Sequence, residues 1–322
     1  MTGAGSRAGA HAPCRRLATL DLGTNTVRLL VVDARGPEWR PLHEAQRVTR
    51  LGERQSGAGV LQAAAMARTV DAVTEFARLA RALGAEDIHV VATSAVREAD
   101  NRAEFTALVR RATGLEIHVV SGEEEGRLAL AGVSGGLPDL GGTFVLVDAG
   151  GGSTEIVRAE HARPRAAVSL PLGVVALAER FVGAGPVDWG AFAAMRREAD
   201  RRLAEALPAA LLVPPRPPLV GTAGTVTTLA ALDLGLEGYE PDRVQGHRLG
   251  RPAVERLLGR LGRLTVAERE ALPCVEPGRG DLLIAGIAIV LAVLARLSGE
   301  SLIVSDRGLR EGIVHDLLAG GR

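Results

Sequence analysis

The sequence contains no lysine, and all 38 of its basic residues are arginine. A GC-rich coding bias is the simplest explanation, but the absence still limits the chemistry. It excludes a P-loop lysine, a Schiff-base lysine and a Ser-Lys catalytic dyad. Any phosphate group must therefore be bound by arginine, backbone N–H groups, hydroxyls or a metal ion.

Aromatic residues and cysteines are also scarce. Aromatic side chains make up 2% of the chain, so leucine, valine and alanine must fill its core. The two cysteines, Cys14 and Cys274, form no CxxC pair, so we expect no disulfide and a reducing, cytoplasmic location. Acidic residues, also 38, balance the basic ones, which gives no reason to expect a nucleic-acid partner.

The sequence contains no recognisable signal peptide or membrane span. Residues 1–16 are rich in Gly, Ala and Arg without an apolar core, so we expect a flexible tail. The strongest apolar run, LLIAGIAIVLAVLA, covers the 14 residues 282–295. A bilayer span needs about 20 residues, so this run is interpreted as a buried helix and no membrane partner is expected.

Length and pattern indicate an α/β protein with two domains. A chain of 322 residues suggests two domains on a prior of about 150 residues each. Asn101 and Glu104 have the spacing of a capping box, and GTAGT at 221–225 predicts a Gly/Thr loop before a helix. We expect strands within 17–33 and at 88–95, 116–121, 219–221 and 301–305, alternating with helices at 60–83, 101–112, from 123, 173–183, 188–206, 252–262, 266–271, 280–297 and 308–319.

Two stretches share one unusual pattern. ATLDLGTNTVRLLVVD (18–33) and VLVDAGGGSTEIV (145–157) both run from apolar residues through Asp, Gly and hydroxyl residues back to apolar residues. Both patterns predict a glycine hairpin, and their aspartates, Asp21 and Asp148, are 127 residues apart. A unit repeated at this spacing suggests two similar lobes with a cleft between them.

The hairpins are suited to an anion. Glycine lets backbone N–H groups approach a ligand, and successive free N–H groups form an anion-binding nest. An acid at the strand tip would repel phosphate, so Asp148 is interpreted as a ligand of Mg²⁺ or its waters. A dinucleotide site would need G-x-G-x-x-G opening a helix, and here both spacing and context fail. A tight hairpin without a ligand is the remaining alternative.

The stretch SGEEEGR, residues 121–127, is a second candidate. Ser121 and Glu124 fit a capping box, and acids in a first helical turn suit the helix dipole. Glu125 is not needed for the cap and is a candidate general base, or simply another first-turn acid. Arg97, just after a strand, has two interpretations: an anion ligand, or a partner of Glu98.

Taken together, these segments resemble the exopolyphosphatase and guanosine-pentaphosphate phosphohydrolase family, within the actin-like and sugar-kinase-like phosphotransferase superfamily. The matching pieces follow the family order from about residue 17 to 317. They are DLGTNTVRLLV, VATSAVREADN, VSGEEEGRLALAGV, VLVDAGGGSTEIV, SLPLGVVALAERF, LVGTAGTVTTLAAL and VSDRGLREGIV. Gly126 stands where many relatives have Ala, a difference that looks harmless.

The resemblance implies two ribonuclease-H-like (actin-like ATPase) lobes, at 17–132 and 133–322, with the active site in the cleft between them. Glu125 would be the base that activates water. Mg²⁺, with a monovalent cation as a further candidate, would be held by Asp148, Asp21 and Glu155. The expected phosphate ligands are Thr24, Asn25, Ser94, Arg97, Gly150, Gly151, Gly152, Ser153 and Thr222. A homodimer is also expected.

The expected function is that of a Mg²⁺-dependent exopolyphosphatase, which releases terminal orthophosphate from inorganic polyphosphate. Longer relatives continue into a helical C-terminal region that helps to hold long chains, so a preference for short chains is expected here. Guanosine pentaphosphate (pppGpp) is the main alternative substrate. A small-metabolite kinase of the same superfamily and a non-catalytic sensor of an alarmone or polyphosphate are the more distant alternatives.

Overall fold

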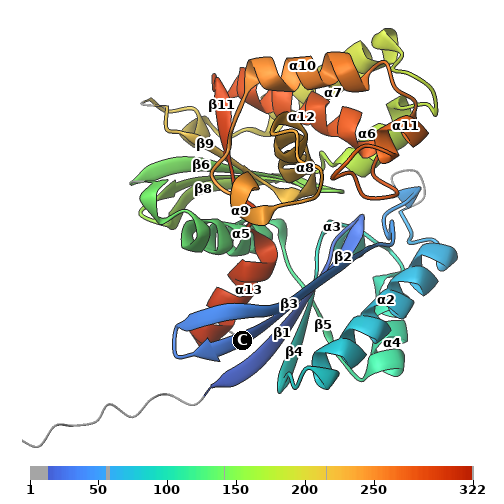
Figure 1. The fold of residues 1–322 in the computed structure, drawn as a ribbon, viewed down its shortest axis with the longest axis vertical. Coiled ribbons are helices and arrows are strands. Elements are labelled where there is room, and N and C mark those ends of the chain that lie inside the picture. The colour runs from blue at the N-terminus through green and yellow to red at the C-terminus, as the bar shows by residue number, and fades with distance from the viewer. Residues whose placement is uncertain (1–13, 56–58, 141, 215, 321–322) are drawn as a thin grey trace, which may run out of the picture.

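The computed structural model describes residues 14–320, except 56–58, 141 and 215. Two sheets, each covered by helices, lie one above the other in Figure 1. Most of the segment expected to be a tail lies outside the described residues. Its last two residues, Arg15 and Arg16, already belong to the first strand.

The first sheet has five strands in the order β3-β2-β1-β4-β5. The first three form an antiparallel meander, and β4 and β5 continue the sheet parallel to β1. The strands are β1 (Arg15–Leu22), β2 (Thr26–Arg35), β3 (Glu38–Val48), β4 (Asp87–Ala92) and β5 (Ile117–Val119).

The second sheet repeats this arrangement. In its order, β10-β11-β9-β6-β7-β8, an antiparallel meander is again followed by two parallel strands, and β10 is added at the edge. The strands are β6 (Thr143–Ala149), β7 (Thr154–Glu160), β8 (Arg163–Leu170), β9 (Leu219–Thr222), β10 (Arg248–Gly250) and β11 (Ser301–Val304). The protein is therefore an α/β protein of two ribonuclease-H-like lobes, and this prediction is confirmed.

Alternate residues of the central strands enter different cores, because successive side chains of a strand point to opposite faces. Val145 and Val147 of β6 belong to the large core of the second lobe, whereas Phe144 and Leu146 pack in a cluster with α5 (Gly122–Gly136). Both faces of the sheet are thus buried, which explains the nearly continuous apolar run in β6.

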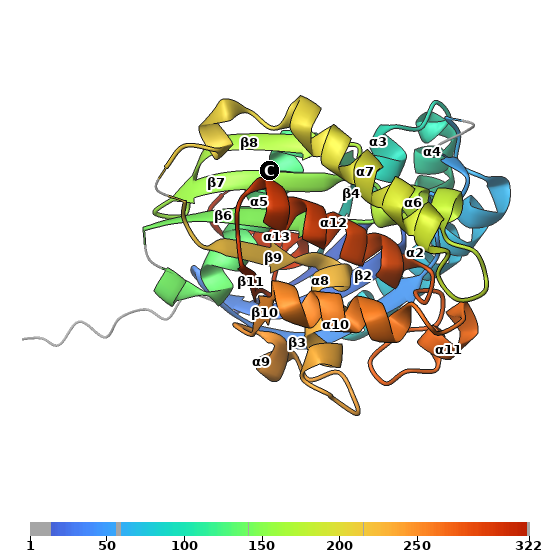
Figure 2. The ribbon, with the colours of Figure 1, turned by 90° about the horizontal axis from the view of Figure 1, so that it is seen from above.

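Helices cover both sheets (Figure 2). In the first lobe α2 (Ala63–Ala82) and α4 (Arg102–Thr113) share a core with the sheet. The second lobe carries α6 (Val174–Phe181), α7 (Trp189–Ala206), α8 (Ala223–Asp233), α9 (Pro241–Val244), α10 (Arg251–Leu261), α11 (Val266–Glu270) and α12 (Leu282–Arg296). Residues 282–294 of α12 are all buried, as expected for this apolar run. Within the described chain, no helix is long and apolar enough to span a bilayer.

Two helices join the lobes by crossing over. α5 follows the first sheet in the chain but packs on the second, and α13 (Leu309–Leu318), near the chain's end, packs on β1 and β2 (Figure 1). The helices meet backbone to backbone: a Cβ at Gly132 would lie 1.9 Å from the carbonyl oxygen of Gly308, and one at Gly312 1.8 Å from that of Leu128. Only glycine permits this approach.

Three local predictions were wrong. β4 ends at Ala92, and Ser94 opens the short helix α3 (Ser94–Arg97), so the strand predicted to reach residue 95 is too long. Asn101 does not cap α4, because its side chain accepts from Leu61 N (2.9 Å) and donates to Leu61 O (3.1 Å). The Gly/Thr loop predicted at 221–225 is absent, since β9 passes directly into α8 through Ala223 at φ 74°.

Candidate active site between the lobes

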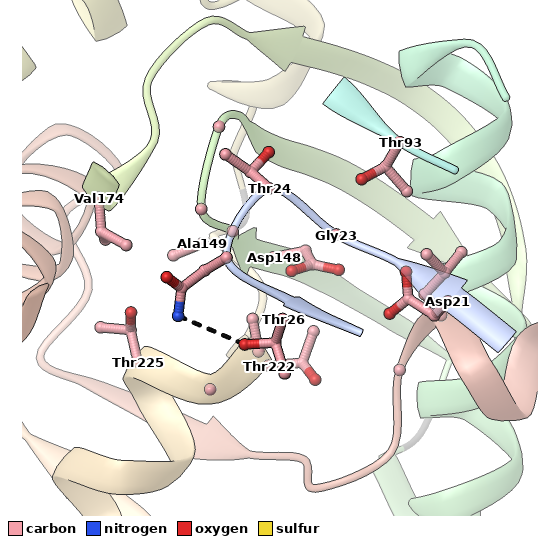
Figure 3. A pocket seen from close by; sticks show the side chains of 18 of the residues that line it. Asp21, Gly23, Thr24, Thr26, Thr93, Asp148, Ala149, Val174, Thr222 and Thr225 are labelled. Carbon is pink, nitrogen blue, oxygen red and sulfur yellow. Dashed lines mark hydrogen bonds between the residues drawn. The ribbon is translucent and has the colours of Figure 1, made fainter. Parts of the chain in front are cut away.

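A cavity of about 120 Å³ lies where the two glycine hairpins meet. It forms at the carboxyl ends of the parallel strands, where open α/β sheets bind ligands. The hairpins reach it from opposite lobes (Figure 3). Of the expected site residues, those in its wall are Asp21, Thr24, Asn25, Ser94, Glu125, Asp148, Gly150, Gly151, Gly152, Ser153 and Thr222. Five separate sequence motifs therefore supply most of one site.

The two hairpins have the same turn. Gly23 N donates to Thr26 O over 3.0 Å in the first, and Gly150 N donates to Ser153 O over 2.9 Å in the second. They also pack against each other without room for a side chain. A Cβ at Gly152 would lie 2.5 Å from Thr24 Oγ1 and 2.6 Å from Ser94 Oγ. The glycines thus place free backbone beside the hydroxyls of the opposite lobe.

Four carboxyl groups line the cavity and are almost fully buried: Asp21 (7% exposed), Glu125 (8%), Asp148 (9%) and Glu311 (5%). Burial raises the pKa of Asp21 and of Asp148 to about 6, although the charge of Arg28 opposes the rise in both. Their side chains face the same space in Figure 3, and Asp21 Oδ1 has no hydrogen-bond partner among the described residues. Such a pair of acids is costly to bury unless a cation joins it.

These acids fit a hard divalent cation. Among the described residues, no three His, Cys, Asp or Glu side chains converge as a complete metal site. Mg²⁺ does not require one, because it usually keeps several waters and takes one or two carboxylates together with substrate phosphates. Asp21 and Asp148 supply that number of carboxylates, and the unpaired oxygen of Asp21 is available to it.

Glu155 lies behind the cavity rather than in its wall. It is opposite Asp148 in the β6–β7 ladder, 1% exposed, and accepts from Ser169 Oγ over 2.7 Å. Burial raises its pKa well above the usual range, and the nearby charges of Glu125 and Asp148 add to this shift. Glu155 is thus next to Asp148 in the sheet but outside the cavity wall.

Glu125 is held by Arg97. Arg97 Nη1 donates to Glu125 Oε2 over 2.8 Å and to Val120 O over 3.1 Å, and its Nε donates to Glu98 Oε1 over 3.2 Å. Arg97 does not line the cavity. It contacts Glu98, as one of its two interpretations expected, but its buried contact is Glu125. Burial raises the pKa of Glu125 to about 7 while Arg97 lowers it, which is a suitable range for a base near neutral pH.

The neighbouring acid has a different environment. Glu124 N donates to the Ser121 side chain over 3.1 Å, so the cap at the start of α5 is present. The Glu124 carboxylate does not return to the Ser121 backbone as a full capping box would; its Oε1 lies 3.2 Å from Nε2 of His118. Of these two glutamates, only Glu125 lines the cavity.

Three arginines at the border of the cavity were missed. Arg28, Arg279 and Arg310 line both this cavity and an adjoining one of about 540 Å³, called here the outer cavity. Arg28 pairs in register with Asp21 on the first hairpin, and DRGLREG contains Arg310, so both lay inside recognised motifs. Arg279 lies in an irregular segment before α12, and nothing in its local pattern marks it.

Gly224, at the start of α8, lets two of these cations come together. A Cβ there would lie 2.3 Å from Arg279 Nη1 and 3.2 Å from Arg28 Nη2. Arg279 Nη2 also donates to Thr26 Oγ1 over 3.2 Å, which ties the second lobe to the first hairpin. Beside them Thr222, next to Asp148 in the sheet, donates from Oγ1 to Arg307 O over 2.9 Å.

The site therefore combines a buried carboxylate near neutral pKa, an acid pair suited to Mg²⁺, glycine hairpins and clustered arginines. This combination defines a two-lobed protein for chemistry on phosphate anions. Comparison with known proteins agrees: residues 30–320 match the Ppx/GppA phosphatase family, so the chain belongs to that family of enzymes.

Individual relatives are similar over almost the whole chain. Exopolyphosphatase 2 of Mycobacterium tuberculosis is 37% identical over 317 residues, which cover 94% of this chain and 98% of the relative. Guanosine-5'-triphosphate,3'-diphosphate pyrophosphatase of Aeromonas salmonicida is 30% identical, and the match covers 94% of this chain but 59% of that protein. The crystal structure of the Ppx/GppA family member from Aquifex aeolicus superposes with a TM-score of 0.79 at 32% identity, covering 96% of this chain and 99% of that one.

Proposed function

We propose that the protein is a Mg²⁺-dependent exopolyphosphatase that releases orthophosphate from the end of inorganic polyphosphate. One observation carries the proposal: a buried carboxylate, Glu125, held by Arg97, lies in the same small cavity as two opposed glycine hairpins. The similarity to exopolyphosphatase 2 of M. tuberculosis supports the substrate class.

In the proposed mechanism Glu125 accepts a proton from the attacking water. Arg97 keeps one carboxylate oxygen of Glu125 fixed and leaves the other for that proton. The terminal phosphoryl group binds to backbone N–H groups of Gly151–Ser153, since that of Gly150 already donates within the turn, and to donors of the opposite lobe, Thr24, Asn25 and Ser94. Phosphoryl transfer depends mainly on such positioning and on charge stabilisation.

Asp21 and Asp148 are the residues proposed to hold Mg²⁺. When bound, the ion supplies positive charge to the phosphoryl oxygens, which the acids alone would repel. The same proposal includes a monovalent cation as a further candidate ligand of this site.

The three border arginines are proposed to bind the phosphates that follow the terminal one. Arg28, Arg279 and Arg310 lie where the inner cavity opens into the outer cavity. Guanidinium groups suit phosphate oxygens, and they would stabilise the charge that develops on the leaving chain. In this proposal each end of the broken bond has its own ligands.

We propose a preference for short chains. The chain has no lysine, and its 38 basic and 38 acidic residues balance, so there is no excess positive charge to retain many phosphates. The outer cavity of about 540 Å³ has room for a few phosphates rather than for a long polymer.

Guanosine pentaphosphate remains the second candidate substrate. The outer cavity has a volume typical of small-molecule sites. Part of its wall is apolar or aromatic, including Tyr239, Pro241, Val275 and Pro277, and this wall is suited to a nucleoside. The match to the A. salmonicida protein supports the same alternative.

A phosphate-release assay separates these functions. The substrates are short polyphosphate, long polyphosphate, guanosine pentaphosphate and ATP, each with and without Mg²⁺ and with K⁺ or Na⁺. The proposal expects Mg²⁺-dependent release, fastest from short polyphosphate. Faster release from guanosine pentaphosphate would establish the second candidate. Binding without release would favour a sensor, and ATP-dependent phosphorylation of a metabolite would favour a kinase.

A homodimer and a cytoplasmic location are further proposals, taken from the family resemblance and from cysteine use. Both cysteines are free thiols, which agrees with a reducing compartment. Sedimentation analysis tests the dimer, and cell fractionation tests the location.

A further inference from the structure

The outer cavity contains its own carboxylates beside its arginines. Arg310 Nη2 lies 3.0 Å from Glu44 Oε2, and Arg279 Nε lies 2.8 Å from Glu276 Oε2. All four side chains line the outer cavity, and neither glutamate lines the inner one. Two of the three border arginines are thus already paired with anions of the protein itself.

The two sides of these pairs differ in exposure. The side chains of Arg279 and Arg310 are 10% and 12% exposed, whereas those of Glu276 and Glu44 are 34% and 49% exposed. A carboxylate at the solvent side can leave its partner and become hydrated at little cost. A buried guanidinium cannot. When the solvent-side carboxylate leaves, Arg279 has no other carboxylate partner among the described residues, and Arg310 keeps only Glu311, 3.2 Å away. Each guanidinium can then accept another anion.

The Arg279–Glu276 pair is also poorly aligned. Its two facing atoms, Arg279 Nε and Glu276 Oε2, make no hydrogen bond with any described residue, although both are buried. The other oxygen of Glu276 accepts from Gln46 Nε2 of the first lobe over 2.5 Å. Buried polar atoms without a hydrogen bond are costly, so an oxygen ligand with better geometry would relieve this pair.

Arg28, next to Arg279, adds a second positive charge to this part of the outer cavity. Arg28 has no ion-pair or hydrogen-bond partner within the described ranges, and Gly224 brings it next to Arg279. Burial lowers the pKa of Arg279 to about 10; the charge of Glu276 opposes this shift, and the like charge of Arg28 adds to it. These two neighbouring guanidinium groups, of which only Arg279 has a carboxylate partner among the described residues, can therefore bind further negative charge.

We propose that Glu44 and Glu276 are specificity-determining residues that occupy Arg310 and Arg279 until the substrate's own phosphates displace them. The inference rests on the proposed function, because it assigns the outer cavity to the phosphates beyond the terminal one. The two carboxylates reduce affinity for every substrate long enough to reach them. A substrate held wholly within the inner cavity does not compete with them.

The test compares the full-length protein with its Glu44→Gln and Glu276→Gln variants. Calorimetry in metal-free buffer, which prevents turnover, gives the dissociation constants for orthophosphate, tripolyphosphate and a longer polyphosphate. Removal of either competing charge is expected to tighten binding of the longer chains about three- to tenfold and to leave orthophosphate, which has no phosphate beyond the terminal one, unchanged. Glu205→Gln is the matched control, because Glu205 pairs with Arg201 at 2.6 Å on the exposed face of α7, away from the cleft.

Three results would overturn the proposal: unchanged affinity for all chains, an equal gain for orthophosphate, or weaker binding of the longer chains. The last would mean that the carboxylates orient the arginines rather than compete for them. Phosphate release from the same samples with Mg²⁺ tests the proposed function separately. Wild-type protein that binds the chains but does not hydrolyse them with Mg²⁺ would contradict the proposed function and still measure the competition. Wild-type protein that neither binds the chains without metal nor hydrolyses them with Mg²⁺ would contradict both.

Discussion

Arg97 donates from Nη1 to Oε2 of Glu125 over 2.8 Å, and neither partner comes from the glycine hairpins that suggested the site. Arg97 ends α3, just after β4, and Glu125 is in the first turn of α5. The pair therefore spans the path from the first sheet to the crossover helix. It keeps the carboxylate of Glu125 in the cavity while the guanidinium remains behind it.

Replacing Glu125 with Gln is expected to reduce hydrolysis by roughly 10²–10⁴-fold, because the amide cannot accept a proton from water. The substitution keeps the volume and the contact with Arg97, so the fold should survive. Substrate binding should persist or tighten, since the lost charge had repelled the phosphates. Steady-state phosphate release and calorimetric binding measure the two effects.

Glu124→Gln is the control for this variant. Its carboxylate lies toward His118, and the cap of α5 uses the Glu124 backbone rather than its side chain. Its activity should stay close to that of the wild type. Loss of activity in Glu124→Gln with normal activity in Glu125→Gln would reverse the two roles, and activity in both would place the base elsewhere.

Replacing Arg97 with Gln tests whether it tunes the base. Its charge opposes the rise in the pKa of Glu125, so its loss should raise that pKa further above about 7. The acidic limb of kcat/KM should then move to higher pH by about 1–3 units. Glu98→Gln, which removes the exposed partner of Arg97, should leave the limb in place. A lower kcat/KM with an unshifted limb would instead favour Arg97 as a direct phosphate ligand.

Much of this site could be predicted because its residues lie in local motifs. Asp21, Asp148 and the glycines sit at strand ends, where the change from apolar to small polar residues is visible in the sequence. The capping pattern accounted for Glu124 and not for Glu125, and the family resemblance then pointed to Glu125 as the base. Arg279 was not predictable, because only the packing of an irregular segment against Gly224 and Thr26 gives it a role.

The missed strands have a similar explanation. β3 is the edge of the first sheet, is largely exposed, and includes Pro41, so it lacks the apolar alternation of a strand buried on one face. β8, likewise at a sheet edge, has an exposed start and only partly buried residues after it. Asn101 fitted a capping pattern, but a tertiary contact with Leu61 took its side chain instead. Local pattern thus predicted the interior better than the edges.

Gly152→Ala tests the contact between the hairpins. A Cβ at this position would lie 2.5 Å from Thr24 Oγ1 and 2.6 Å from Ser94 Oγ, so hydroxyls proposed to bind phosphate must move. A displacement of this size at a reacting centre can cost of the order of 10²-fold in rate. Gly183→Ala is the control, since a Cβ there meets nothing within 4 Å. Equal kcat/KM for the two variants would contradict a tight fit of the lobes during catalysis.

Asp148→Asn is expected to weaken the response to Mg²⁺ more than it harms the fold. The carboxamide keeps the shape of Asp148 but lacks the charge that the ion needs. In a titration of phosphate release with Mg²⁺, the variant should require more ion for half-maximal rate and reach a lower maximum. An unchanged titration would limit Asp148 to a structural role in the hairpin.

When no divalent ion is present, Asp148→Asn is expected to stabilise the fold at high pH. Burial raises the pKa of Asp148 in the folded protein to about 6, above its value of 3.8 in the unfolded chain. The stabilising contribution of the protonated group is therefore complete below pH 3.8 and is lost as the pH rises through about 6.

At about pH 8 the wild type must bury a charged carboxylate and Asp148→Asn need not, so the variant should be more stable by the order of 1–3 kcal/mol. At about pH 4 the two proteins should unfold at nearly the same temperature, and addition of Mg²⁺ at about pH 8 should stabilise only the wild type. Thermal unfolding at both pH values measures this directly, and a variant less stable than the wild type at about pH 8 without metal would show that the charge of Asp148 is already compensated within the protein.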